Sequence, residues 1–350
     1  MTGRTKLKRG PPRGLAGPRA EKTVSLALQG GGAHGAFTWG VLDAILEDGR
    51  LAIEAVTGAS AGAMNAVVMV EGWLEGGADG ARSQLETFWR RVSIDGTLNP
   101  VQRGLFDHFL SFWSGQVWGD LVASRLSPYD TNPLNINPLR DAVDELIDFE
   151  RVRACDGVKL FITATNVWTG KVAVFERPQL TADHLMASAC LPTVFKAVEI
   201  DGEPYWDGGY MGNPALFPLF YGTGTDDILL VQINPVERRQ TPRTAGEIHN
   251  RLNEITFNGN LLRELRAIEF VTRLIDTGKL SRDEYKRVLM HRIDGSGVLD
   301  DYQASSRLHA DWSFFVTLRD AGRATAQRWL KTHYAAIGQR ATLDLKAEVA

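Results

Sequence analysis

Five consecutive residues have the spacing of a serine nucleophile held in a sharp turn. Gly58-Ala59-Ser60-Ala61-Gly62 is a G-x-S-x-G pattern between a predicted buried strand, 52–57, and a predicted helix, 61–70. A strained strand-to-helix turn projects the serine hydroxyl from the end of a sheet, and a Cβ two residues away would clash. The pattern therefore predicts Ser60 as the nucleophile of an acyl transfer. A glycine-rich turn capped by Ser60 is the plainer alternative.

A second glycine cluster, residues 30–35 with the sequence GGGAHG, follows a predicted strand at 24–29 and precedes a predicted helix at 36–47. Its G-x-G-x-x-G spacing also occurs in dinucleotide-binding turns, which place an acidic residue about twenty positions later, at the end of the second strand. Glu54 lies near the start of that strand instead, so a carboxylate for a ribose is missing. Bare glycine N–H groups are also suited to hold a developing oxyanion. The residues predicted to do so are Gly30, Gly31 and Gly32.

A serine hydroxyl needs a base, and the candidate is Asp207. It is followed by Gly208 and Gly209 and comes directly after the predicted strand pair 199–206. A carboxylate before two glycines fits an exposed turn that another loop can approach closely, although a plain β-turn has the same sequence. No histidine stands in a recognisable motif, and we expect structural roles for all seven. They are His34, His108, His184, His249, His291, His309 and His333.

The elements that must position these residues indicate an α/β fold. Strand, glycine turn and helix follow one another twice from residue 24, which implies parallel strands. Residues 24–235 are predicted to form one α/β core and 245–350 a helical region packed on it. Residues 76–135 are predicted to be an insertion, whose aromatic part, 104–118, is either a lip for acyl chains or ordinary core packing. The further predictions are a hairpin of 158–166 with 171–175, a strand at 228–233, and helices at 182–191, 248–276, 283–289 and 313–336.

Composition excludes several classes of protein. The 350 residues carry a net charge of −3, with 44% hydrophobic residues, so neither chain-wide nucleic-acid binding nor wholesale disorder is expected. Cys155 and Cys190 are too few for a disulfide framework. Residues 1–22 carry a net charge of +6 and are rich in Pro and Gly, which predicts a disordered basic arm, either a plain tail or an attachment to anionic membranes. The sequence shows no signal peptide, and we expect a cytoplasmic protein.

Taken together, the glycine run, the G-x-S-x-G about 25 residues later and the distant Asp-Gly-Gly resemble the patatin-like phospholipase family. Two further segments agree with the resemblance: residues 187–195, with the sequence ASACLPTVF, and Asn213-Pro214 after the Asp-Gly-Gly. The resemblance covers roughly residues 24–235. Members often carry Arg before the last glycine of the loop, where this chain has His34.

The resemblance implies a three-layer α/β/α fold with a mainly parallel central sheet, to which a C-terminal helical region is added. It implies a serine acyl hydrolase of lipid esters, of phospholipase A or lysophospholipase type, with a Ser60–Asp207 dyad and no metal or organic cofactor. Backbone donors do not depend on the His34 side chain, so an oxyanion hole remains possible. The alternatives are a catalytically silent membrane-binding module or, with less support, a dinucleotide-binding protein. The residues expected to support the motifs are His34, Gly35, Gly58, Gly62, Gly208 and Gly209.

Overall fold

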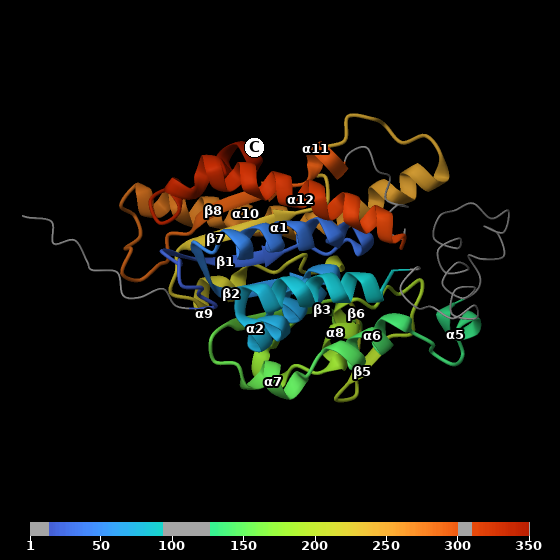
Figure 1. Ribbon diagram of the computed structural model, residues 1–350. Coiled ribbons are helices and arrows are strands. Elements are labelled where there is room, and N and C mark those ends of the chain that lie inside the picture. The colour runs from blue at the N-terminus through green and yellow to red at the C-terminus, as the bar shows by residue number, and fades with distance from the viewer. Residues whose placement is uncertain (1–13, 94–126, 300–309, 350) are drawn as a thin grey trace, which may run out of the picture.

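The computed structural model describes residues 14–93, 127–299 and 310–349. Its centre is an eight-stranded mixed sheet, with hydrogen-bonded neighbours in the order β5-β6-β3-β2-β1-β7-β8 and with β4 paired to β3 (Figure 1). The five strands from β3 to β8 along this order are parallel, while β4, β5 and β6 are antiparallel to their neighbours. The strands are β1 Lys22–Leu28, β2 Leu51–Ala59, β3 Lys159–Asn166, β4 Val172–Glu176, β5 Val198–Ile200, β6 Glu203–Asp207, β7 Asp227–Gln232 and β8 Leu289–Asp294.

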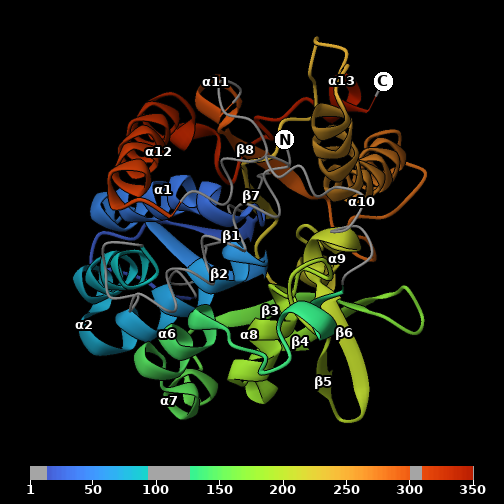
Figure 2. The same ribbon diagram turned by 90° about the vertical axis from the view of Figure 1, so that its right-hand side faces the viewer.

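Helices cover both faces of this sheet (Figure 2). The α-helices are α1 Gly35–Asp48, α2 Ala61–Arg91, α5 Pro128–Thr131, α6 Pro138–Leu146, α7 Phe149–Ala154, α8 Ala182–Ser188, α9 Phe217–Gly222, α10 Ala245–Asp276, α11 Ser296–Leu299, α12 Trp312–His333 and α13 Leu345–Glu348. Short 3-10 helices are η1 Gly32–His34, η3 Arg177–Gln179, η4 Gly208–Tyr210 and η6 Tyr334–Ala336. No helix in the described ranges is both long and apolar enough to cross a bilayer.

Side chains of the buried strands point alternately to the two faces of the sheet, and each face has its own hydrophobic core. In β1, Leu26 and Leu28 join the core that α1, α2, α8 and α12 cover, whereas Ala27 faces the core covered by α9, α10 and α13. Successive side chains of a strand point to opposite faces, so a strand buried on both sides is apolar throughout. The fold class predicted from the sequence, a three-layer α/β/α arrangement with a mainly parallel sheet, is confirmed.

Three sequence-based expectations differ from the structure. The predicted helix 283–289 is absent, and its last residue instead begins β8, which extends the sheet beside β7. The predicted insertion does not start at 76, because α2 continues to Arg91 after a kink at Gly76 and Gly77 and buries Phe88 and Trp89. Both glycines have non-helical dihedral angles, which glycine adopts at little cost.

The third difference concerns the disordered arm predicted over residues 1–22, which is wrong for its described part because those residues lie against the sheet. Leu15 is 3% exposed and exchanges two backbone hydrogen bonds with Ile53, at 2.9 and 3.0 Å. Lys22 is the first residue of β1. The rest of the arm, residues 1–13, and the aromatic segment 104–118 lie outside the described residues.

Candidate active site

Ser60 occupies a strained turn between β2 and α2. Its backbone has φ 50° and ψ −123°, a conformation that is costly for a residue with a Cβ and that concentrates at functional sites. Ser60 is the N-cap residue of α2, yet its side chain makes no capping hydrogen bond. The hydroxyl of this half-buried residue therefore does not cap the start of the helix, and it remains available for chemistry.

Close backbone contact explains the glycines on either side of Ser60. A Cβ on Gly62 would lie 2.2 Å from the Leu28 carbonyl oxygen at the end of β1. A Cβ on Gly58 would lie 2.7 Å from the carbonyl carbon of Gly62. Both distances are far below any real contact, so the turn closes only with glycine at these two positions.

The order of strands along β3 brings Asp207 to the same place. Strand β4 pairs with residues 161–165 of β3 and so occupies one of its two edges. On the other edge, β2 pairs with residues 159–163 and β6 with residues 164–166. The two strands thus meet end to end, with Ser60 following the last residue of β2 and Asp207 ending β6.

The Asp207 carboxyl group is completely buried, and burial raises its pKa to about 7. Smaller effects from the Gly209 N–H, which donates to Asp207 Oδ1 at 2.6 Å, and from the Ser60 hydroxyl act in the opposite direction. Asp207 Oδ2 has no hydrogen bond of standard geometry within the described residues, although Ser60 is near enough to affect the carboxyl group. A base is often poorly aligned with its nucleophile before substrate binds, so this open oxygen fits a proton acceptor for Ser60.

Gly208 and Gly209 hold the Asp207 turn against its surroundings. A Cβ on Gly208 would lie 2.2 Å from the Thr163 carbonyl oxygen in β3. A Cβ on Gly209 would lie 3.0 Å from the Phe257 ring of α10. Because β3 and α10 both pack closely against the turn, positions 208 and 209 need small residues.

The glycine loop passes directly beside the serine turn. A Cβ on Gly30 would lie 2.7 Å from Ser60 Cβ, and Gly32 has φ 58°. The Gly30 N–H donates to Asn213 Oδ1 at 2.6 Å, so it is already engaged. The N–H groups of Gly31 and Gly32 have no hydrogen-bond acceptor in the described chain. Of the three glycines predicted to line an oxyanion hole, Gly31 and Gly32 retain available donors.

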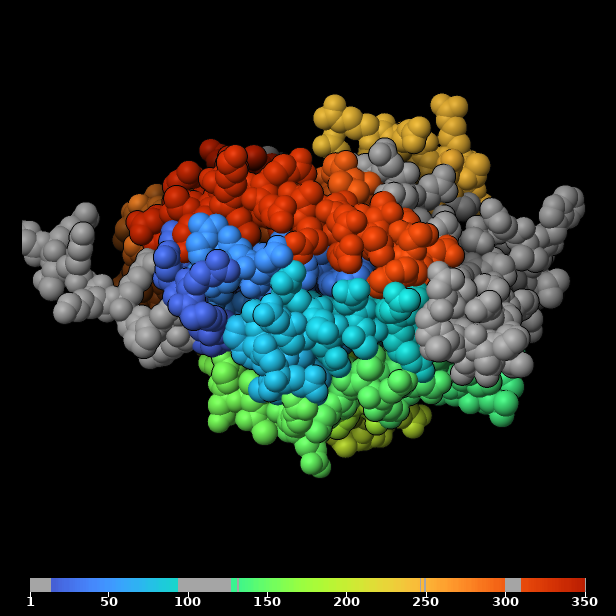
Figure 3. Space-filling view, viewed as in Figure 1, coloured from blue at the N-terminus to red at the C-terminus, as the bar shows by residue number. Residues whose placement is uncertain are grey.

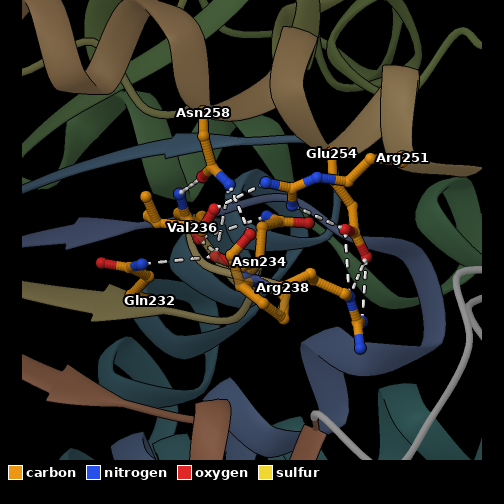
Figure 4. Close-up of polar contacts among 9 residues, drawn as sticks. Gln232, Asn234, Val236, Arg238, Arg251, Glu254 and Asn258 are labelled. Carbon is orange, nitrogen blue, oxygen red and sulfur yellow. Dashed lines mark hydrogen bonds and ion pairs between the residues drawn. The ribbon is translucent and has the colours of Figure 1, made fainter. Parts of the chain in front are cut away.

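Buried side-chain amides hold this loop, and sequence reasoning did not identify most of them. Asn213 binds the Gly30 N–H, while Asn234 Nδ2 donates to the Gly30 carbonyl at 2.7 Å. Gln29 Oε1 accepts from the Asn234 N–H at 2.9 Å, and Gln29 Nε2 donates to Asn258 Oδ1 at 3.1 Å. Figure 4 shows how Asn258 of α10 lies over the 232–238 segment. Only Asn213 had a sequence signal, the Asn-Pro pair after Asp-Gly-Gly.

The end of α8 contacts both proposed catalytic residues. Ser188 Oγ accepts the Ser60 N–H at 2.9 Å, and the Cys190 carbonyl accepts the Asp207 N–H at 2.8 Å. Sequence reasoning noted this segment only through its family resemblance and assigned Ser188 no role. Burial raises the pKa of the Cys190 thiol to about 12, which disfavours the thiolate at neutral pH.

His34 and Gly35 lie at the start of α1. His34 is 2% exposed, and a Cβ on Gly35 would lie 2.6 Å from Ala61 Cβ, so the N-termini of α1 and α2 touch. Three other described histidines have structural contacts, and one of them is His333, whose ring centroid lies 5.6 Å from that of Trp329. His184 Nδ1 accepts the Thr181 N–H at 3.1 Å. His291 Nε2 lies 2.9 Å from Asp227 Oδ1 near the start of β7, at the opposite end of the parallel strands from Ser60. His108 and His309 lie outside the described residues.

The residues that the structure describes contain no group of three or more His, Cys, Asp or Glu arranged to hold a metal ion.

The chain is similar to one protein family and to several solved structures. The family model described as Patatin-like phospholipase matches residues 26–220. VipD from Legionella pneumophila aligns at 17% identity, covering 94% of this chain and 72% of VipD, with a TM-score of 0.38. ExoU in its complex with SpcU from Pseudomonas aeruginosa aligns at 15% identity, covering 96% of this chain and 60% of the other, with a TM-score of 0.39. No curated protein sequence matches the chain significantly.

Proposed function

The chain belongs to the patatin-like phospholipase family, and we propose that it is a serine acyl hydrolase of lipid esters that uses Ser60 and Asp207 as a catalytic dyad. The observation that carries the proposal is the strained Ser60 turn beside a buried Asp207 carboxyl group with one open oxygen. Strain at Ser60 costs free energy that a merely structural turn would avoid.

The reaction follows from these positions. Asp207 Oδ2 takes the hydroxyl proton while Ser60 Oγ attacks the ester carbonyl carbon. The N–H groups of Gly31 and Gly32, together with the N-terminus of α2, hold the oxyanion of the tetrahedral intermediate. Asp207 returns the proton to the departing alcohol, which leaves an acyl-Ser60 ester. A water molecule that loses its proton to Asp207 then attacks this ester, and Asp207 returns the proton to Ser60 Oγ as the fatty acid is released.

The two alternatives from the sequence have less support. A dinucleotide-binding role needs an acidic residue for the ribose, but Glu54 accepts the N–H groups of Gly224 and Thr225 near the start of β2, away from the glycine loop. A catalytically silent membrane-binding module would not need to preserve the strained serine and the buried carboxylate together.

A fluorophosphonate probe tests the proposal, because it reacts with activated serine hydroxyls. One adduct is expected, and peptide mass spectrometry should place it on Ser60. Ser60→Ala should abolish labelling and lower kcat by about 10⁴ on a soluble ester. Ser25→Ala is the matched control, because Ser25 is a buried serine whose hydroxyl has no hydrogen bond within the described residues. Labelling that persists in Ser60→Ala contradicts the assignment. A panel of phospholipids, lysophospholipids, neutral lipids and polyesters then defines the substrate.

A further inference from the structure

The first half of α10 exposes a stripe of large apolar side chains. Ile248, Leu252 and Ile255 are 44%, 56% and 51% exposed, and their spacing of four and three places them on one face of the helix. In the second half of α10, the buried residues Leu261, Leu265 and Ile268 lie on the opposite face and pack against the sheet. Packing on the sheet therefore explains Leu261, Leu265 and Ile268 but not Ile248, Leu252 and Ile255.

Arginines gather beside this stripe. The loop before α10 and its first turns line a cleft of about 510 Å³ with four arginines and two glutamates, a net charge of +2 on a chain of net charge −3. The four arginines are Arg238, Arg239, Arg243 and Arg251. The segment around residue 250, gold in Figure 3, projects from the top of the molecule.

Two of these arginines are held by the protein and two are available. Arg238 and Arg251 share the buried Glu254, at 2.9 and 3.1 Å (Figure 4). Arg239 is 90% exposed, and its one ion pair among the described residues is with the exposed Glu237. The Arg243 guanidinium forms no ion pair there, although it adds to the effect of the backbone N–H groups of residues 243 and 244 in lowering the pKa of the Glu247 carboxyl group. A pair between two exposed side chains contributes little, so both groups can bind external anions.

The same helix contacts the proposed catalytic loops. Phe257 packs against Tyr210, with ring centroids 5.3 Å apart, and Asn260 Nδ2 donates to the Tyr210 carbonyl at 2.9 Å. Asn258 binds Gln29, which precedes the glycine loop. Phe257 comes two residues after Ile255 and so faces another side of the helix, which places α10 between the apolar stripe and the Asp207 turn.

We propose that Ile248, Leu252 and Ile255, with Arg239 and Arg243, form a surface that docks on an anionic lipid bilayer. The apolar side chains enter the boundary of the acyl region and the two guanidinium groups bind lipid phosphates. This combination of an apolar helix face and flanking arginines is what an interfacial helix requires. The inference rests on the proposed function, because a hydrolase of lipid esters has to reach the bilayer that holds its substrate.

Vesicle flotation of the full chain carrying Ser60→Ala tests the apolar stripe without turnover of the lipid. The vesicles are phosphatidylcholine with and without about one third phosphatidylglycerol. Leu252→Glu should weaken binding to the anionic vesicles about tenfold. Phe270→Glu is the control, because Phe270 is 50% exposed in the second half of the same helix, and its binding should change less than about twofold. Equal losses in both variants overturn the proposal.

Two double variants test the role of the arginines. Arg239→Gln with Arg243→Gln should weaken binding about tenfold at low salt and much less at high salt. Arg328→Gln with Arg340→Gln removes the same charge from an exposed region elsewhere and should have little effect. If the two double variants lose the same affinity, net charge and not this surface controls binding.

A fluorophore reports insertion directly. Cys155 and Cys190 are buried, so a thiol introduced as Leu252→Cys can be labelled selectively with a polarity-sensitive dye. Anionic vesicles should shift its emission to the blue, whereas the dye on Phe270→Cys should not respond. No shift at residue 252, or vesicle binding absent altogether, contradicts the proposal and leaves a protein partner for the stripe.

The soluble-ester assay separates the two proposals. Leu252→Glu should hydrolyse a soluble short-chain ester like the unchanged chain but lose turnover of vesicle lipid. If the unchanged chain hydrolyses no ester, the proposed function fails while flotation and the fluorophore still decide the docking surface. If hydrolysis is normal and Leu252→Glu keeps its vesicle turnover, only the docking surface fails.

Discussion

The turn that carries Ser60 and the loop that lies beside it are held in two different ways. The turn closes through backbone contacts that leave no room for a Cβ at Gly58 or Gly62. The loop is held by side chains from distant segments, since Asn213 and Asn234 bind the two backbone groups of Gly30. The nucleophile is thus positioned by local sterics and the proposed oxyanion donors by a buried polar network. Removal of a single hydrogen bond weakens such a network in part, whereas a Cβ at Gly58 or Gly62 would prevent the turn from closing.

The largest expected effect is at the proposed base. Asp207→Asn preserves the shape of the side chain but cannot accept the Ser60 proton, so kcat should fall by about 10⁴. The double variant with Ser60→Ala should be little worse than either single variant, because the two groups act as a unit. Glu264→Gln is the control, since burial also raises the pKa of Glu264 to about 7. If Asp207→Asn remains active, the dyad is wrong, and a histidine base takes its place.

The amide network should give an intermediate effect. Asn213→Ala removes the acceptor of the Gly30 N–H and loosens the loop, so kcat should fall by about 10² with little change in KM. Phosphonate labelling should become slower but remain on Ser60. Asn258→Ala, which contacts Gln29 but not Gly30, should lose less. If Asn213→Ala lowers kcat as much as Ser60→Ala does, the distinction between the turn and the loop is wrong. Thermal unfolding of each variant checks that the fold is retained.

Ser188 tests how far the serine turn depends on its neighbours. Ser188→Ala removes the acceptor of the Ser60 N–H, and kcat should fall about tenfold with KM nearly unchanged. Ser188→Thr keeps the hydroxyl and should restore part of the loss. Activity of Ser188→Ala equal to that of the unchanged chain would mean that the two glycines alone hold Ser60.

The pH profile should follow the Asp207 carboxyl group. Because only the ionised form accepts a proton, kcat/KM should rise with pH and level off above about 7, the pKa set by burial. The same pKa, raised from the usual 3.8, means that the folded state favours the protonated carboxyl group. The contribution of Asp207 to stability is therefore greatest below pH 3.8 and declines as pH rises towards 7. Glu264→Gln should leave the kinetic profile unchanged, and a shifted profile would assign it to Glu264.

The smallest effect on chemistry is expected from the basic arm. Deletion of residues 1–13, which carry a net charge of +5, should leave hydrolysis of a soluble ester unchanged. Binding to anionic vesicles should weaken at low salt and matter little at high salt. Unchanged vesicle binding at low salt would leave these residues without the membrane role that their charge suggests.

Local sequence determined what depends on neighbouring residues. The period of apolar residues and the glycines after each strand predicted β1, α1, β2 and the Ser60 turn, because strand–turn–helix units are specified within some thirty residues. Asp207 was identified by its two following glycines and by family resemblance. The short apolar run 288–290 suits a helix or a strand equally well in isolation, which is why the sequence predicted a helix ending at Leu289 and did not predict β8.

Only the tertiary structure decided which distant segments meet. Strands β2 and β6 share one edge of β3, and this alone places Asp207 beside Ser60. Asn234 and Ser188 acquire their roles in the same way, since a buried amide or hydroxyl group gains a partner only when the backbone it binds is brought to it. The apolar stripe of α10 became visible because the sheet covers the opposite face of that helix. Periodicity records that a residue is apolar, whereas packing decides whether it is covered.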